Sequence, residues 1–178
     1  MNTIQCSLVT FVSLSLLSCG GGGNSTATAP VEPEPAIAAV LSAEEPTGAV
    51  SVSEARKSAK PGDAITVAGI VAGAAKPFTE GYASLVLGDA AMETCDKIPE
   101  DECPTPWDAC CADPDELKGM RLTLQVLGAD GTPVAQSLKG ISGLAEMDAL
   151  VASGTVSADS TAENLVVNVT KLHRKAKP

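Results

Sequence analysis

Aromatic residues and histidine are scarce in this chain of 178 residues, which has one Trp, one Tyr, two Phe and one His. Proteins that bind single-stranded nucleic acid stack its bases on aromatic side chains in a positively charged groove. This chain has few aromatic side chains and a formal net charge of −10. It is therefore not expected to bind nucleic acid.

The lack of histidine also bears on catalysis. His173 is the only one, and it stands near the C-terminus among Lys and Arg residues, where we expect it to be exposed. A Ser-His-Asp or Cys-His site needs its histidine inside a cleft. The chain also has no glycine-rich phosphate loop before a helix, and no carboxylate pair with the spacing of a glycosidase. We predict a non-enzymatic protein without a cofactor or a metal centre.

No apolar run is long enough to cross a bilayer comfortably. Residues 4–17 form a mostly apolar run of fourteen residues that ends in Leu-Leu-Ser-Cys at Cys19, before four glycines. A short apolar run that ends in small residues is typical of an export signal. The Leu-Leu-Ser-Cys ending resembles the lipobox of bacterial lipoproteins, although no Lys or Arg precedes the run.

This resemblance implies cleavage after Ser18 and lipidation of Cys19, so that the chain is anchored to a membrane of the bacterial cell envelope. Two or more acyl chains give stable anchoring, whereas one chain is marginal. Gly20 follows the cysteine in place of the aspartate that commonly retains such proteins at the inner membrane. The expected location is the outer membrane, facing the periplasm.

Composition divides the chain into four parts. Residues 1–18 are expected to be a signal peptide, and residues 19–48 a lipidated cysteine with a disordered tether. The tether is rich in Gly, Ser, Thr and Ala and then in Pro and Glu, a composition that buries too little apolar surface to offset ordering entropy. Residues 49–172 form the predicted domain, and residues 173–178 a basic tail.

Five segments of the domain have the alternation or β-branched content of strands: residues 63–71, 82–88, 120–128, 148–156 and 164–172. Ser51 and Glu54 fit a capping box, which predicts a short helix through residue 59. Residues 139–148 are broken by glycine and predict one or two helical turns. Gly69 and Gly154 lie inside strands, where glycine often marks a bulge or a tight bend of a barrel.

The pattern indicates an all-β fold. The segments ITVAGIV, GYASLVLGD, DALVASGTV and NLVVNV resemble strands in small OB-fold modules of exported bacterial proteins. The resemblance implies a five-stranded OB-like barrel with a short N-terminal helix and a long insert between its second and third strands. OB-folds bind oligonucleotides or oligosaccharides, but a fold alone does not give a function.

The insert, residues 89–118, holds most of the charge and four of the six cysteines. Residues 89–116 contain ten acidic residues and one lysine, a net charge of −9. An exported protein folds in an oxidising compartment, so the even number of cysteines favours two disulfides among Cys95, Cys103, Cys110 and Cys111. Two pairings stay open, Cys95–Cys110 with Cys103–Cys111 and Cys95–Cys111 with Cys103–Cys110. Each bond would contribute about 2–4 kcal/mol and staple a loop that lacks a core.

Other uses of these residues compete with the staple. Four thiolates could bind Zn²⁺ or Cu(I), but the adjacent pair Cys110 and Cys111 can hardly give both sulfurs to one tetrahedron. A redox role is disfavoured because neighbouring acids raise thiol pKa values. Trp107 either packs in a small core within the insert or contacts a partner, since Trp is enriched in binding hot spots.

Together these features predict a membrane-anchored binding or structural module of the cell envelope. Its acidic, disulfide-locked loop would favour a cationic protein or an ion as partner. The alternative is a protein that handles Zn²⁺ or Cu(I) in the envelope through the cysteine cluster.

Overall fold

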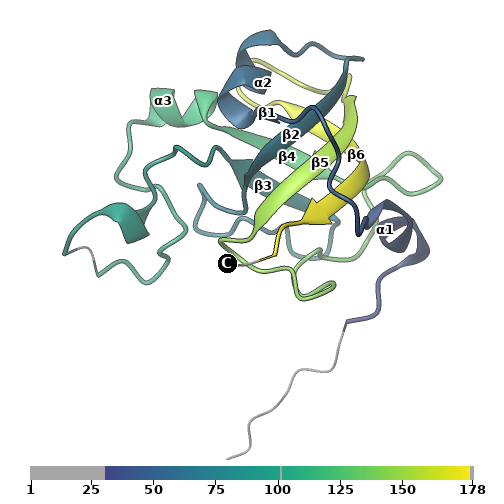
Figure 1. The fold of residues 1–178 in the computed structure, drawn as a ribbon, viewed down its shortest axis with the longest axis horizontal. Helices are drawn as coiled ribbons and strands as arrows, with labels where there is room; N and C mark the ends of the chain where they lie inside the picture. The colour runs from purple at the N-terminus through teal and green to yellow at the C-terminus, as the bar shows by residue number, and fades with distance from the viewer. Residues whose placement is uncertain (1–30, 101, 177–178) are drawn as a thin grey trace, which may run out of the picture.

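The computed structural model describes residues 31–100 and 102–176, and it shows a barrel with a long side insert (Figure 1). In chain order the elements are α1 (Pro35–Val40), β1 (Val50–Ser51), α2 (Val52–Ser58), β2 (Ala64–Ile70), β3 (Ser84–Gly88), the 3₁₀ turn η1 (Cys95–Lys97), α3 (Pro114–Gly119), β4 (Arg121–Gln125), β5 (Ala149–Val156) and β6 (Val166–Arg174). None of the helices in the described ranges is long and apolar enough to cross a membrane.

Five strands close the barrel. β2 pairs antiparallel with both β3 and β5, and β3 pairs antiparallel with β4. β6 completes the circle, because it runs parallel to β4 and antiparallel to β5. The two-residue strand β1 adds a short parallel pairing to β2. The five predicted strands and the all-β class are therefore confirmed, and the closed mixed barrel is consistent with the OB-like prediction.

The barrel core follows the predicted alternation. Leu122, Leu124 and Val126 point inward and are each 1 % exposed, whereas Thr123 and Gln125 between them are only half-buried. Burying each such apolar side chain stabilises the fold by about 1.5–3 kcal/mol. The barrel interior is thus filled by side chains and is not a ligand channel.

Two strand glycines allow the barrel to close. A Cβ at Gly69 would collide with the carbonyl oxygen of Gly88, and one at Gly154 would collide with the carbonyl oxygen of Asn168. Gly154 also lies at a register shift between β5 and β6. The predicted bulge is confirmed at Gly154, whereas Gly69 lies at a close approach of two backbone segments.

The short helix predicted after residue 51 is α2. Ser51 Oγ accepts from the Glu54 backbone N–H at 3.2 Å, and Glu54 Oε2 accepts from the Ser51 N–H at 3.1 Å. This reciprocal pair satisfies two N–H groups that the first turn leaves without helical partners. Val52 and Ala55 are fully buried and join the core. The capping box therefore sets both the start of α2 and the face that packs on the barrel.

The predicted tether is wrong for residues 31–48, which belong to the domain. Helix α1 buries Ile37 completely and Val40 almost completely against the barrel. Leu41 forms a parallel bridge with Leu172 of β6. Pro35 stands in the first turn of α1, where its missing N–H costs nothing. Residues 19–30 of the predicted tether and the signal peptide lie outside the described residues.

Two smaller predictions are also corrected. Residues 139–148 form turns and no helix, because Ser142 and Met147 have positive φ values of 48° and 65°. The basic tail begins later than expected, since β6 continues to Arg174. His173 is half-buried, and its Nδ1 lies 3.0 Å from the Ser42 carbonyl oxygen. The expected exposure of His173 is therefore wrong.

Candidate functional site

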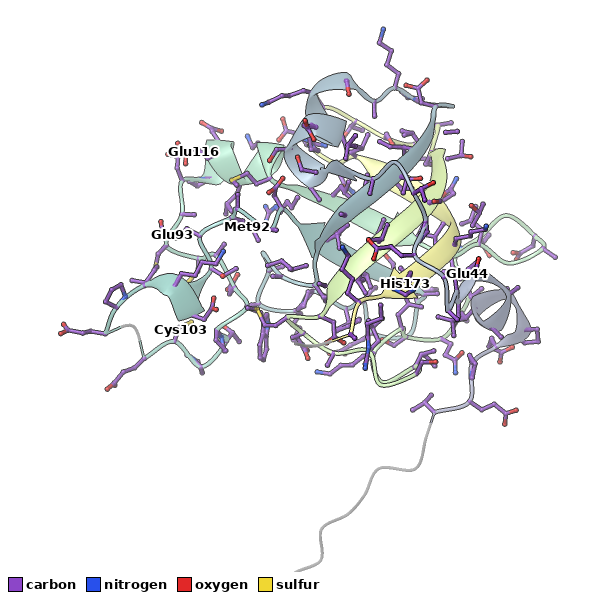
Figure 2. The ribbon with its side chains drawn as sticks, viewed as in Figure 1. Glu44, Met92, Glu93, Cys103, Glu116 and His173 are labelled. Carbon is purple, nitrogen blue, oxygen red and sulfur yellow. The ribbon has the colours of Figure 1, made fainter. Side chains whose placement is uncertain are left out.

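The acidic insert, residues 89–118, leaves the barrel after β3 and returns to it through α3 just before β4. It extends to one side of the barrel, and Glu93, Cys103 and Glu116 all lie on this extension (Figure 2). Asp113 caps the N-terminus of α3, and its Oδ1 accepts from the backbone N–H groups of Asp115 at 2.8 Å and Glu116 at 3.2 Å. The insert is thus built in part from regular local structure, η1 and α3.

A small hydrophobic core of its own holds the insert. Met92 is fully buried, Ala109 is 1 % exposed and Leu117 is 8 % exposed, and all three pack with Ala72 from the β2–β3 connection. Trp107 packs at the edge of this cluster. The sequence prediction assumed that the insert lacked a core, because its apolar residues are separated by acids and follow no period.

Backbone hydrogen bonds fix the insert further. The N–H of Cys95 donates to the Asp108 carbonyl at 2.8 Å, and the N–H of Asp96 donates to the Pro106 carbonyl at 3.0 Å. The Gly73 N–H of the barrel donates to the Trp107 carbonyl at 2.8 Å. These bonds bring the two halves of the insert together and attach them to the barrel.

The four cysteines form no disulfide in the structure, so the predicted staple is not what shapes the insert. The Cys95 and Cys110 sulfurs are 3.6 Å apart, and those of Cys110 and Cys111 are 3.9 Å apart, compared with about 2.05 Å for a bond. The insert is ordered by its own small core and by backbone hydrogen bonds, which supply the order that was attributed to crosslinks.

Three of the sulfurs still converge. Those of Cys95, Cys103 and Cys110 all lie within 4.8 Å of one another. Cys95 is buried, Cys103 is half-buried and Cys110 is exposed, so the cluster opens to solvent on one side. Burial and hydrogen bonds with Cys110 and Cys103 raise the pKa of Cys95 to about 12. Hydrogen bonds with Thr105 lower the pKa of Cys103 below its ordinary value.

Asp89 joins the insert to the barrel. Its carboxylate is 4 % exposed; Oδ2 accepts from the Ser53 N–H of α2 at 2.8 Å, and Oδ1 accepts from the Ala91 N–H at 2.9 Å. Burial raises the pKa of Asp89, but the hydrogen bonds from Ala91 and Ser53 outweigh it, so the pKa lies below the ordinary value. The sequence analysis counted Asp89 only as one of the ten acidic residues of residues 89–116 and missed this role.

The other acids of the insert mostly face solvent. Seven described carboxylates are exposed: Glu93, Asp96, Glu100, Glu102, Asp113, Asp115 and Glu116. Across residues 31–100 and 102–176, one ion pair involves an acid of the insert, that of Asp115 with Lys118 at 3.0 Å. Lys97 instead donates to the backbone carbonyl of Met92 at 2.6 Å. The insert therefore presents a negative surface that is largely uncompensated by its own cations.

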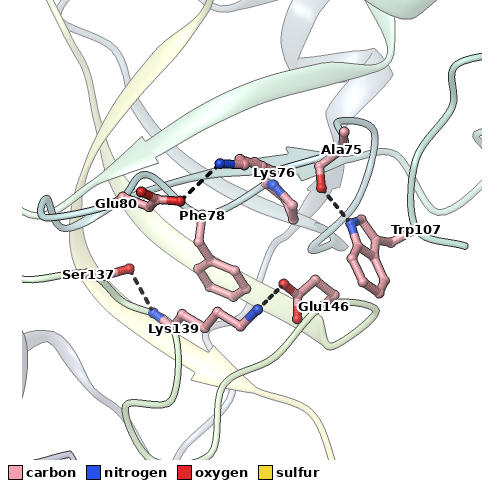
Figure 3. A pocket seen from close by; sticks show the side chains of 9 residues that line it. Ala75, Lys76, Phe78, Glu80, Trp107, Ser137, Lys139 and Glu146 are labelled. Carbon is pink, nitrogen blue, oxygen red and sulfur yellow. Dashed lines mark hydrogen bonds and ion pairs between the residues drawn. The ribbon is translucent and has the colours of Figure 1, made fainter. Parts of the chain in front are cut away.

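Trp107 lines a hollow of about 280 Å³ between the insert and the barrel (Figure 3). Its indole N–H donates to the Ala75 carbonyl at 3.1 Å, and the ring stays half-buried. Phe78 lies in this hollow, and the ion pair of Lys139 with Glu146, 2.6 Å apart, is at its rim. Trp107 thus serves the small core and also borders a surface depression. The other lining residues come from two connections, β2–β3 and β4–β5, so no sequence spacing could have gathered them.

Two other residues considered in the sequence analysis, His173 and Cys19, are not part of the insert. Figure 2 shows His173 on the barrel, away from Cys103 in the insert. Cys19, the predicted lipidation site, lies outside the described residues. No family model, no curated protein and no solved structure matches this chain.

Proposed function

We propose that this chain is a non-enzymatic binding module of the bacterial cell envelope, in which a membrane-anchored barrel presents the acidic insert to a cationic protein. We assign the barrel to the OB class. Its five-stranded closed order, with β2 paired to both β3 and β5, supports that assignment.

One observation carries the proposal: the acids of the insert are exposed on a scaffold of fixed shape. Met92 and Leu117 anchor the scaffold from inside, while carboxylates such as Glu93, Glu102 and Glu116 stay outside. A charged surface held in one shape loses little entropy when a partner binds, and its field attracts cations and repels phosphates. The partner is therefore expected to be basic and not a nucleic acid.

Removing charge from the insert should weaken binding of a basic ligand. We expect the triple variant Glu93→Gln, Glu102→Gln and Glu116→Gln to bind a lysine- and arginine-rich peptide roughly tenfold more weakly at low salt, about 1.4 kcal/mol, because each exposed pair contributes about 0.2–1 kcal/mol. Affinity and its salt dependence would be measured by calorimetry.

The matched control makes the same charge change elsewhere. Glu32, Glu34 and Glu44 are exposed and lie outside the insert. Their triple replacement by Gln should leave peptide affinity nearly unchanged. Equal losses in the two triple variants would show that only net charge matters, and the proposed role of the insert would then be abandoned.

Membrane attachment through Cys19 is the second element of the proposal. It is supported by the apolar run at residues 4–17 and by the Leu-Leu-Ser-Cys ending. The outer membrane, with the domain in the periplasm, is the proposed location because Gly20 stands where a retention signal would.

Metabolic labelling with an alkyne fatty acid should mark the wild-type chain in a bacterial host and should fail to mark Cys19→Ala. The reason is that the thiol of Cys19 is the proposed acyl acceptor. Cys6→Ala is the control, since Cys6 lies in the segment that would be removed, and it should keep the label. Label that persists in Cys19→Ala would exclude this anchor without affecting the binding role of the insert.

A second candidate function, metal handling, is favoured by one specific observation, the convergence of three sulfurs in the insert.

A further inference from the structure

A single disulfide does not account for the convergence of three sulfurs in the insert. Cys95 lies in η1, and Cys103 and Cys110 come from the segment that folds back over it. The Cys95 N–H bond to the Asp108 carbonyl fixes this return, so the sulfurs are brought together by the backbone. A disulfide would use two of the three thiols and leave the third outside, whereas a metal ion can use all of them.

The separations suit a thiophilic ion. Zinc–thiolate bonds are about 2.3 Å long, so two sulfurs on one tetrahedral zinc lie about 3.8 Å apart. The Cys95 and Cys110 sulfurs are 3.6 Å apart, and the Cys103 sulfur is within 4.8 Å of both. For all three sulfurs to reach one ion, the Cys103 sulfur has to move by about an ångström at most. Its neighbours Cys110 and Glu102 are exposed, so there is room for this shift.

The fourth cysteine lies outside this group. The Cys111 sulfur is 3.9 Å from that of Cys110, but it does not lie within 4.8 Å of all three others. Adjacent cysteines rarely point both sulfurs at one ion, which agrees with this arrangement. Three thiolates leave one coordination position open to solvent on the exposed side of Cys110, as in zinc sites with three protein ligands.

The surroundings also favour a cation. The exposed carboxylates of Asp96 and Glu102 are near neighbours of Cys95 and Cys103 in the chain, and residues 89–116 of the insert carry a net charge of −9. A negative field raises the local concentration of cations. Soft thiolate ligands select zinc and monovalent copper over hard ions such as Ca²⁺ and Mg²⁺.

We infer that Cys95, Cys103 and Cys110 form a three-thiolate site for a thiophilic d¹⁰ metal ion, Zn²⁺ or Cu⁺, on the acidic insert. Each coordinating thiol gives its proton to solvent, so three thiols that bind one ion release three protons. The inference rests on the second candidate function, metal handling, and is independent of the membrane anchor and of the basic partner proposed above.

The test uses the full chain in mild detergent, purified and reduced under anaerobic conditions. Zn²⁺ and Cu⁺ are titrated separately against chromophoric chelators, which distinguishes the two ions. The wild type should bind one ion per chain. Cys103→Ser and Cys110→Ser should each lose at least about a hundredfold in affinity, more than the loss of an outer-shell partner causes. These two residues are not fully buried, so the fold should survive, as circular dichroism would verify.

Cys111→Ser is the matched control, because it removes a neighbouring thiol outside the group, and it should bind as the wild type does. A loss in Cys111→Ser equal to that in Cys110→Ser would overturn the assignment of ligands. If the wild type bound neither Zn²⁺ nor Cu⁺, the proposed site would be wrong. So would a non-reducing peptide map of protein from the exporting cell that showed Cys95 and Cys110 joined in a disulfide overturn it.

Discussion

Ile37→Ala is expected to lower the free energy of unfolding by about 2–5 kcal/mol, although Ile37 lies in a segment whose composition is that of a linker. Ile37 is 0 % exposed and packs in the barrel core. Alanine would remove buried methyl and methylene groups and leave a cavity, because the closed barrel around it cannot collapse fully. Urea unfolding of the reduced chain would measure the loss as a shift in midpoint with an unchanged slope.

The neighbouring exposed position provides the control. Ala39→Gln lies on the solvent side of α1 and should change stability by no more than about 0.5 kcal/mol. If residues 31–48 behaved as a tether in solution, Ile37→Ala would be as neutral as Ala39→Gln. That result would contradict the packing of α1 on the barrel.

The position of α1 shows where composition misleads. Its surroundings are rich in Pro and Glu, which favoured a tether, but Ile37, Val40 and Leu41 are spaced at i, i+3 and i+4. That spacing forms one apolar face of a helix, and Pro35 in the first turn is a helix-start signal. A six-residue helix has only one such repeat, so the signal was present but too short to outweigh the composition.

The barrel strands were predictable because each one buries alternate residues, as Leu122, Leu124 and Val126 do. Alternation is a local property and can be read from a single sequence. The site was not predictable in the same way. Its order comes from contacts between distant segments, such as Met92 with Ala72 and Leu117, and no spacing in the sequence records them.

The arrangement of the cysteines could not be predicted from the sequence either. Their number and the predicted export signal suggested covalent pairs, since an oxidising compartment favours disulfides. Which sulfurs meet depends on how the chain returns from Cys103 to Cys110 over η1, and that path is set by hydrogen bonds such as Asp96 to Pro106. The sequence therefore identified the four residues of interest but not the group of three that the fold brings together.

Asp89→Ala is expected to cost about 3 kcal/mol at neutral pH, because it removes the carboxylate that accepts from Ser53 and Ala91. Hydrogen bonds to a charged group contribute about 1.5–3 kcal/mol each, and the two share one side chain, so their sum is an upper limit. Asp89→Asn keeps one oxygen acceptor and should cost about half as much. Urea unfolding would compare the three proteins.

The pH dependence separates this role from a loss of packing. The pKa of Asp89 is lowered in the folded state, so its contribution is fully present above the unfolded pKa of about 3.9 and is lost as pH falls through the folded pKa. The stability difference between the wild type and Asp89→Asn should therefore stay constant from about pH 7 to about pH 5 and shrink below about pH 4. A difference that stays the same down to about pH 2 would mean that the carboxylate charge contributes nothing to holding the insert on α2.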